Sequence, residues 1–227
     1  MISGSTKLYD LICDNPHLVL VVENFNIPLG FGNPTIQAIC RKHHINEHLF
    51  LTITGLYCQG QFYAFDPQHY NAADAKQVLT FLKNFHVYFL EEKIPTLKLL
   101  IDRKAEKSDA DKYSKVIRKF IHDYAAEVFE HIQYENTIVF PYIESLLRKQ
   151  TSHYRIDQFK KRHSNLEEKL ADLRNLLLRH VPPQYDSVVR RRILVELYDL
   201  EYNLKIHDFL ENHLLIPVIE RIERELK

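Results

Sequence analysis

Glycine is scarce in this sequence and confined to one end of it. The chain has 227 residues and five glycines, all of them before residue 68, and none occurs from Asn71 to Lys227. A glycine in a helix interior costs about 1 kcal/mol relative to alanine. A glycine-free stretch of this length therefore predicts long helices after residue 71.

Cysteine is also rare, and its placement excludes two classes of small protein. Cys13, Cys40 and Cys58 are odd in number, all lie in the first part of the chain and are not spaced as Cys-x-x-Cys. This argues against a disulfide scaffold or a zinc ribbon and agrees with a reducing compartment. Because the N-terminus lacks the basic start and apolar block of a signal peptide, we expect a cytoplasmic protein.

Net charge and long apolar runs are absent as well. Lys plus Arg and Asp plus Glu number 30 each, so no overall basic field attracts nucleic acid or anionic lipid. No apolar run reaches about 18 residues, the length that spans a bilayer, and no membrane association is expected. Histidine, in contrast, is abundant, with 13 residues. Histidine is the commonest metal ligand.

One internal repeat has the pattern His-x3-Glu-Asn-x4-Pro. Its copies are displaced by 76 residues, and they are His131, Glu135, Asn136 and Pro141 and then His207, Glu211, Asn212 and Pro217. On an α-helix, residues i and i+4 share a face with Cβ atoms roughly 6 Å apart, so each copy presents an imidazole beside a carboxylate. Apolar residues surround both pairs, and a buried Glu or His is costly unless it is paired or bound to metal. The repeat therefore predicts two inward-facing ligand helices.

Breaks in the apolar periodicity divide the rest of the chain into four helices. They lie near residues 71–105, 109–149, 154–180 and 184–226, with a definite interruption at Val181-Pro-Pro-Gln184. Short connections make sequential helices antiparallel, so the predicted fold is all-α, an up-down-up-down four-helix bundle. Pro95, Pro141 and Pro217 fall inside or late in three of these helices, and each is expected to bend its helix or end it early.

Residues 1–67 differ in composition and predict a small N-terminal helical domain. Thr35 is placed to cap a helix over residues 36–44, and Asn46 to start another, after a turn-rich loop over residues 27–34. Two short helices around a turn also occur in helix-turn-helix DNA readers. The few basic residues here favour a docking or sensor module instead. Residues 61–70 are interpreted as a linker with aromatic anchors.

The two helices without a full repeat each contain a central histidine, His86 or His163. At 1.5 Å per residue, each of these histidines falls at nearly the same height as the repeat histidine of its antiparallel neighbour. The bundle thus brings four imidazoles and two carboxylates to one level. Six ligands are too many for one catalytic zinc and suit two metal ions. Imidazole with carboxylate favours iron, manganese or zinc.

These residues resemble the hemerythrin-like (HHE) cation-binding family, over residues 71–227. Within it, the whole chain is most similar to the di-iron repair-of-iron-centres proteins, which repair iron–sulfur clusters. The resemblance implies six metal ligands, which are His86, His131, Glu135, His163, His207 and Glu211. It implies two iron ions with two histidines each, bridged by Glu135, Glu211 and an oxo or hydroxo group. Glu127 matches a further acid near the ligands in that subfamily.

The resemblance also implies a function, with one departure. It implies a non-haem di-iron protein of the stress response that restores iron–sulfur clusters damaged by nitric oxide or oxidants, with damaged iron–sulfur proteins as partners. The N-terminal domain of those proteins carries adjacent cysteines, and here no two cysteines are adjacent. This departure favours the alternative, a module that binds or senses oxygen or nitric oxide. A homodimer is left open, and so is whether the protein is an enzyme.

Overall fold

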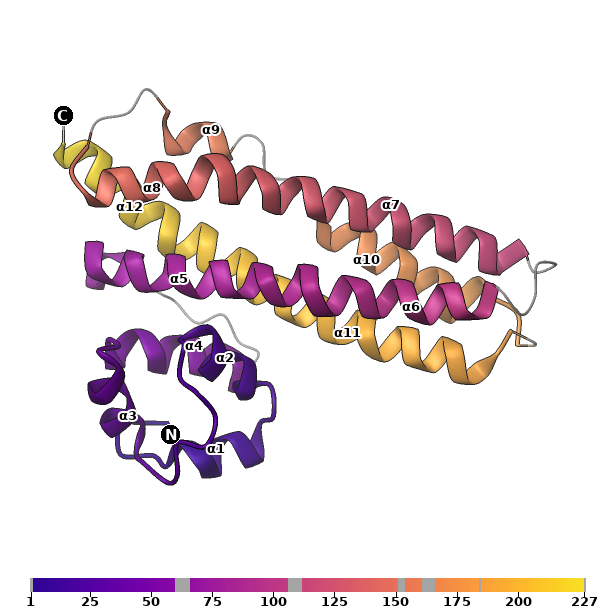
Figure 1. The fold of residues 1–227 in the computed structure, drawn as a ribbon, viewed down its shortest axis with the longest axis horizontal. Coiled ribbons are helices and arrows are strands. Elements are labelled where there is room, and N and C mark those ends of the chain that lie inside the picture. The colour runs from indigo at the N-terminus through magenta and orange to yellow at the C-terminus, as the bar shows by residue number, and fades with distance from the viewer. Residues whose placement is uncertain are drawn as a thin grey trace. The chain divides into compact units, whose positions relative to one another are not determined.

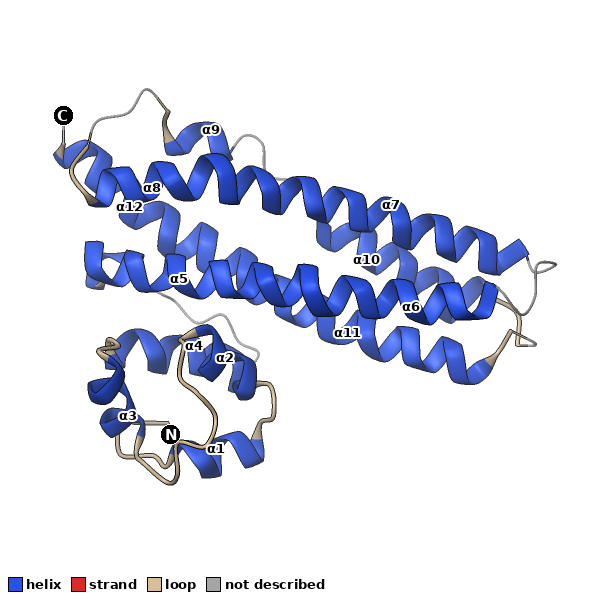
Figure 2. Cartoon of the chain, in the orientation of Figure 1, coloured by secondary structure: helices blue, strands red, loops and turns tan. Residues whose placement is uncertain are grey.

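The structure is a computed structural model that describes residues 2–59, 66–105, 112–150, 154–160, 166–183 and 185–226. Throughout these ranges the chain is built of helices and loops, without a β-strand (Figure 2). None of the helices described is long and apolar enough to cross a lipid bilayer. The all-α prediction is confirmed.

The chain forms two compact units. The first contains Met1–Phe85, Ile143–His153 and Asp208–Lys227, and the second contains His86–Tyr142 and Tyr154–His207. Each is described by itself below. The predicted division into residues 1–67 and 71–227 stays a prediction.

The second unit holds segments of four long helices. Its elements are the end of α5 (Ala72–Tyr88), η2 (Phe89–Lys93), α6 (Ile94–Ala105), α7 (Lys112–Tyr134), η3 (Glu135–Val139), α9 (Ile156–Lys160), α10 (Leu166–Asn175), η4 (Leu176–His180) and α11 (Ser187–Phe209). Segments α6, α7, α10 and α11 alternate in direction along the chain (Figure 1). The predicted up-down-up-down order is therefore confirmed for this unit.

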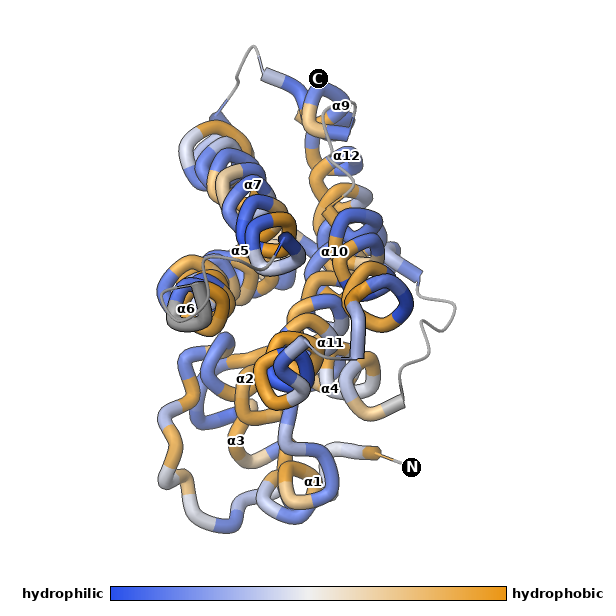
Figure 3. Tube along the Cα trace, turned by 90° about the vertical axis from the view of Figure 1, so that its right-hand side faces the viewer, coloured by the Kyte–Doolittle hydropathy of each residue, from blue (hydrophilic) through white to orange (hydrophobic). Residues whose placement is uncertain are grey.

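Apolar residues at helical spacing form the core of this unit. On α7, Ile117, Ile121 and Val128 are buried, and on α11 so are Leu197 and Leu200. Hydrophilic and hydrophobic residues alternate along the helices in Figure 3. This alternation gives each helix one face to bury and one to expose to water.

The first unit contains the short N-terminal helices. Its elements are α1 (Leu8–Asp14), α2 (Leu18–Asn24), α3 (Ile36–His43), α4 (Glu47–Gln59), the 3-10 turn η1 (Pro67–His69), most of α5, the end of α8 (Phe140–Leu147), η5 (Leu210–Leu215) and α12 (Ile216–Glu225). The Thr35 side chain accepts a hydrogen bond from Ala38 N at 3.2 Å, which confirms the predicted cap. Asn46 accepts one from His48 N at 2.9 Å at the start of α4.

The N-terminal helices of the first unit pack on α5. Asn46 Nδ2 donates to Asp74 Oδ1 at 2.6 Å, and Asn84 Nδ2 donates to the Asn24 carbonyl at 2.9 Å. The rings of Phe25 and Phe81 lie 5.1 Å apart between centroids. The N-terminal helices thus share a core with the beginning of the first long helix.

The three prolines do not end their helices early, which was one of the two predicted effects. Pro95, Pro141 and Pro217 each stand two residues after a π-helical segment, and the helix continues past each of them. Within each segment one N–H bonds to the carbonyl five residues back; these are Ile94 to Phe89, Phe140 to Glu135 and Ile216 to Glu211. The proline ring clashes with the carbonyl of the preceding turn, and a widened turn relieves this clash. The predicted early end is therefore wrong, and the predicted bend stays a prediction.

Candidate metal centre

Four of the predicted ligands come from three helices of the second unit. His86 lies in the last turn of α5, His131 in the last turn of α7, and His207 in the last turn of α11. Glu135 is the first residue of the π segment η3, four residues after His131. Each histidine lies in the last α-helical turn before a π segment, and Glu135 opens one. Such segments occur frequently at functional sites.

The Glu135 carboxylate faces a different imidazole with each of its oxygens. His86 Nε2 lies 3.0 Å from Glu135 Oε2, and His131 Nε2 lies 2.8 Å from Glu135 Oε1. His86 Nε2 is also 3.0 Å from His207 Nε2. One ligand atom from each of His86, Glu135 and His207 lies within 4.8 Å of the other two. The predicted convergence of these four side chains is present in this unit.

The side chains of this cluster are buried to different extents. The exposed fraction of the side chain is 0% for Glu135, 2% for His86 and 12% for His131. His207 is also buried. Burial alone would raise the pKa of Glu135, but the imidazoles of His131 and His86 lower it below its ordinary value. The lowered pKa favours the ionised carboxylate, which is the form that binds a metal ion.

The chemistry of this donor set fits a metal ion. Neither oxygen of Glu135 accepts a well-directed hydrogen bond from the described residues, although imidazole nitrogens lie within 3.0 Å. A buried carboxylate without such bonds is costly. Ligand atoms about 2.1 Å from one metal ion and at right angles to each other lie about 3 Å apart. The spacing of these nitrogens and oxygens therefore matches atoms that point at a shared ion.

His86 has further neighbours that hold its ring. Its Nδ1 lies 3.0 Å from Asn136 Oδ1. The Phe140 ring stacks on it with 5.1 Å between centroids and 9° between planes. Asn136 was not among the predicted site residues. The signal that points to it is its presence at the same place in both copies of the repeat.

Three further residues were predicted at or near the site, and they are Glu211, His163 and Glu127. Glu211 belongs to the first unit. It is the second residue of η5, and its exposed fraction is 1%. Its role as a ligand stays a prediction. His163 lies outside the described residues. Glu127 forms an ion pair with Lys169, and both side chains are more than two-fifths exposed.

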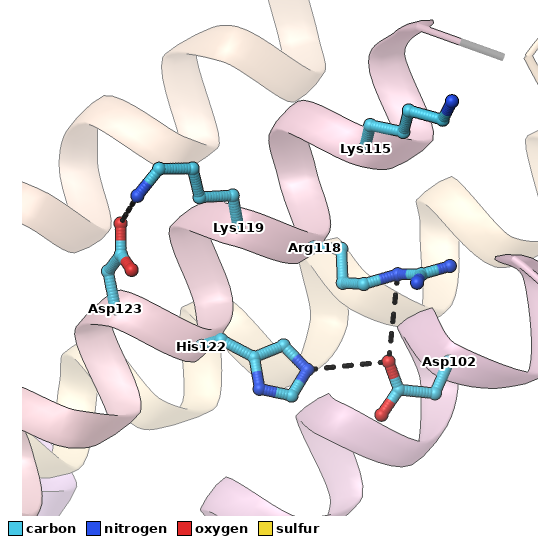
Figure 4. A pocket seen from close by; sticks show the side chains of 6 residues that line it. All are labelled: Asp102, Lys115, Arg118, Lys119, His122 and Asp123. Carbon is cyan, nitrogen blue, oxygen red and sulfur yellow. Dashed lines mark hydrogen bonds and ion pairs between the residues drawn. The ribbon is translucent and has the colours of Figure 1, made fainter.

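A surface pocket on α6 and α7 also contains a histidine and carboxylates, but these are exposed to water and paired with lysine and arginine. It has a volume of about 680 Å³ and is lined by Asp102, Lys115, Arg118, Lys119, His122 and Asp123 (Figure 4). Lys119 pairs with Asp123 at 2.5 Å, and Asp102 is shared by His122 and Arg118. These carboxylates already have cationic partners and contact with water.

A helical bundle whose interior gathers imidazoles around a buried carboxylate is the scaffold of a cation-binding protein. The sequence agrees with this class, because residues 72–219 match the hemerythrin HHE cation binding domain model, and the chain belongs to that family. A comparison with curated protein sequences found no match.

Proposed function

We propose that the chain is a non-haem di-iron protein that takes part in the repair of iron–sulfur clusters damaged by nitrosative or oxidative stress. The observation that carries the proposal is the Glu135 carboxylate with one oxygen toward His86 and the other toward His131. A carboxylate that faces two imidazole groups on opposite sides suits two cations. Its negative charge offsets part of their repulsion.

The donor set supports iron as the resident metal. Imidazole and carboxylate ligands suit iron, manganese and zinc, whereas copper(I) prefers thiolates. The hemerythrin HHE family model is a cation-binding one. In the proposed centre His86 and His207 would hold one ion and His131 the other, and His163 and Glu211 would complete the set.

The residues of the chain would control access to the centre. When bound, the iron pair supplies an exchangeable metal ion and a redox-active site for a diatomic ligand. His86 and Glu135 exclude water from their side of the proposed centre, because their side chains are 2% and 0% exposed. His131 is 12% exposed, so an outgoing iron ion or incoming nitric oxide would pass on its side.

The alternative is a module that binds or senses oxygen or nitric oxide at the same centre. One observation favours this alternative, and it is the burial of the Cys40 thiol. Cys40 is buried, and burial raises the pKa of its thiol to about 12. Because the thiolate is the form that binds metal, Cys40 is unsuited to passing iron to a client protein at neutral pH.

Reconstitution with iron separates these functions. The metal-free protein is loaded with ferrous iron without oxygen, analysed for iron, and exposed to oxygen and then to nitric oxide. Repair predicts two irons per chain and reactivation of a cluster enzyme previously damaged by nitric oxide. Reversible formation of an oxygen adduct without reactivation would support the alternative, and failure to hold iron would contradict both.

A further inference from the structure

His86 is held at both of its ring nitrogens by two consecutive residues of η3. Glu135 Oε2 lies 3.0 Å from Nε2, and Asn136 Oδ1 lies 3.0 Å from Nδ1. The ring is 2% exposed. The second contact is made by an amide, which is neither a metal ligand in the proposed centre nor part of the predicted set.

We infer that Asn136 is a positioning residue that fixes the proton of His86 on Nδ1 and thereby turns the lone pair of Nε2 toward the metal. This inference rests on the proposed metal centre. Asn136 acts through His86 and does not itself touch the ion.

The argument follows from the donors and acceptors of the two groups. A neutral imidazole has one N–H and one bare nitrogen, and an amide oxygen can only accept. The contact at 3.0 Å between Asn136 Oδ1 and Nδ1 is therefore favourable when Nδ1 carries the proton. A bare Nδ1 would set two lone pairs against each other at this contact, and an N–H on Nε2 would point at the metal ion in the loaded protein. In the metal-free protein Nε2–H can donate to Glu135 Oε2 at 3.0 Å, so the proton on Nδ1 is the one that reports on Asn136. Partners of this kind typically change metal affinity by about 10- to 100-fold.

The ring has little freedom to escape this contact. Phe140 stacks on its face at 9° between planes, which limits tilting and leaves rotation within the ring plane. Asn136 at one edge and Glu135 at the other then set that rotation. The orientation of Nε2 is thus defined from three sides.

The π segment explains how one helix reaches both edges of the ring. Consecutive residues of an α-helix are 100° apart around its axis, and a π turn, with more residues per turn, reduces this angle. Glu135 and Asn136 are the first two residues of η3, and Pro141 follows this segment. The widened turn before the proline brings two neighbouring side chains to the same ring.

The test compares variants of Asn136 in the full-length protein. Asn136→Leu keeps the side-chain volume without an acceptor, and Asn136→Asp keeps an acceptor. Thr137→Ala is the matched control, because the Thr137 hydroxyl donates only to the Gln133 carbonyl of its own helix. Circular dichroism checks folding, and Asn136→Ala replaces the leucine variant should the latter lose helical content.

Two measurements are made on each variant. The first is whether Nδ1 of His86 carries a proton in the metal-free protein, from the nitrogen-15 shifts of its ring, assigned with His86→Gln. The second is the affinity for ferrous iron without oxygen. We expect Nδ1–H in the wild type and in Asn136→Asp, and loss of that preference in Asn136→Leu. We expect about 10- to 100-fold weaker iron binding in Asn136→Leu and no change in Thr137→Ala.

The outcomes distinguish this inference from the proposed function. Wild-type protonation of Nδ1 and wild-type iron affinity in Asn136→Leu would overturn the inference, and so would a wild type in which Nδ1 carries no proton. Equal loss of iron affinity in the aspartate and leucine variants would assign Asn136 a packing role instead. A wild type that holds the Nδ1–H tautomer but binds no iron would overturn the proposed function and leave the orientation of His86 by Asn136 standing.

Discussion

Two histidine–carboxylate pairs, each with its histidine on α7, show what separates a proposed metal site from a surface ion pair. His131 Nε2 lies 2.8 Å from Glu135 Oε1, with exposed fractions of 12% and 0%. His122 Nε2 lies 3.4 Å from Asp102 Oδ1, with exposed fractions of 45% and 46%. Both pairs join an imidazole to a carboxylate, but one pair is buried and the other is exposed to water. The exposed pair is hydrated and gains little from a metal ion, whereas the buried pair lacks that solvation.

The neighbours of the two carboxylates differ as well. Arg118 approaches Asp102 at 3.9 Å, so a permanent cation already compensates that charge (Figure 4). Glu135 has imidazoles as its ion-pair partners in the described part of the chain. Imidazole can give up its proton to make room for a metal, and guanidinium cannot. The comparison supports the buried cluster, and not the exposed pair, as the proposed cation site.

The largest effect is expected from removing a proposed metal ligand. His131→Ala should lower the metal content from two ions per chain to one or none, and Glu211→Ala should do the same, with helical content retained. His122→Ala, on the same helix, is the control and should keep the wild-type metal content. Elemental analysis with circular dichroism provides the measurement. Two fully occupied metal positions in both the His131 and the Glu211 variants would contradict the ligand assignment.

A smaller effect is expected from pH in the metal-free protein. The imidazoles of His131 and His86 lower the pKa of Glu135 from its ordinary 4.5. A lowered pKa contributes stability that is present above the unfolded pKa and is lost as the pH falls through the folded one. The free energy of unfolding should therefore fall more steeply from pH 5 to pH 3 in the wild type than in Glu135→Gln, by an amount on the order of 1 kcal/mol.

Urea denaturation at several pH values tests this expectation. The control is Asp102→Asn in the same buffers, because it removes a carboxylate from the exposed pair. Parallel pH curves for the wild type and Glu135→Gln would show that the buried carboxylate is not stabilised by its imidazoles.

The smallest effect is expected at the exposed pair itself. Asp102→Asn should change the free energy of unfolding at pH 7 by about 0.5 kcal/mol or less, because exposed ion pairs contribute little. It should leave the iron content unchanged. A loss of iron in this variant would remove the distinction drawn between the two pairs.

The course of the long helices could be predicted from the sequence. The absence of glycine after Asn71 and the interruption at Val181-Pro-Pro-Gln184 were sufficient, and α11 begins shortly afterwards at Ser187. The π segments could not be predicted from the same signals. A proline removes one N–H and crowds one carbonyl, and a bend, a helix end or a widened turn each accommodates this. The packing of the surrounding helices selects among them.

The candidate site was predicted in part. The repeat and the matching heights of the helices led to His86, His131, Glu135 and His207, which the second unit brings together. Asn136 was missed, because an amide is a weak candidate when metal ligands are sought. Its contact with His86 joins residues 50 positions apart, and sequence spacing does not reveal such a pairing.

The π segments also affect how this bundle can be aligned or recombined with others. Each widened turn contains more residues than an α-helical turn, and one additional residue shifts the phase of the following helix by about 100°. A chimaera that joins the chain to a straight helix across residues 89–93, 135–139 or 210–215 would rotate everything downstream away from its intended neighbours. A junction placed outside these segments preserves the phase. Alignments used for such designs accordingly need a one-residue gap at each of the three places.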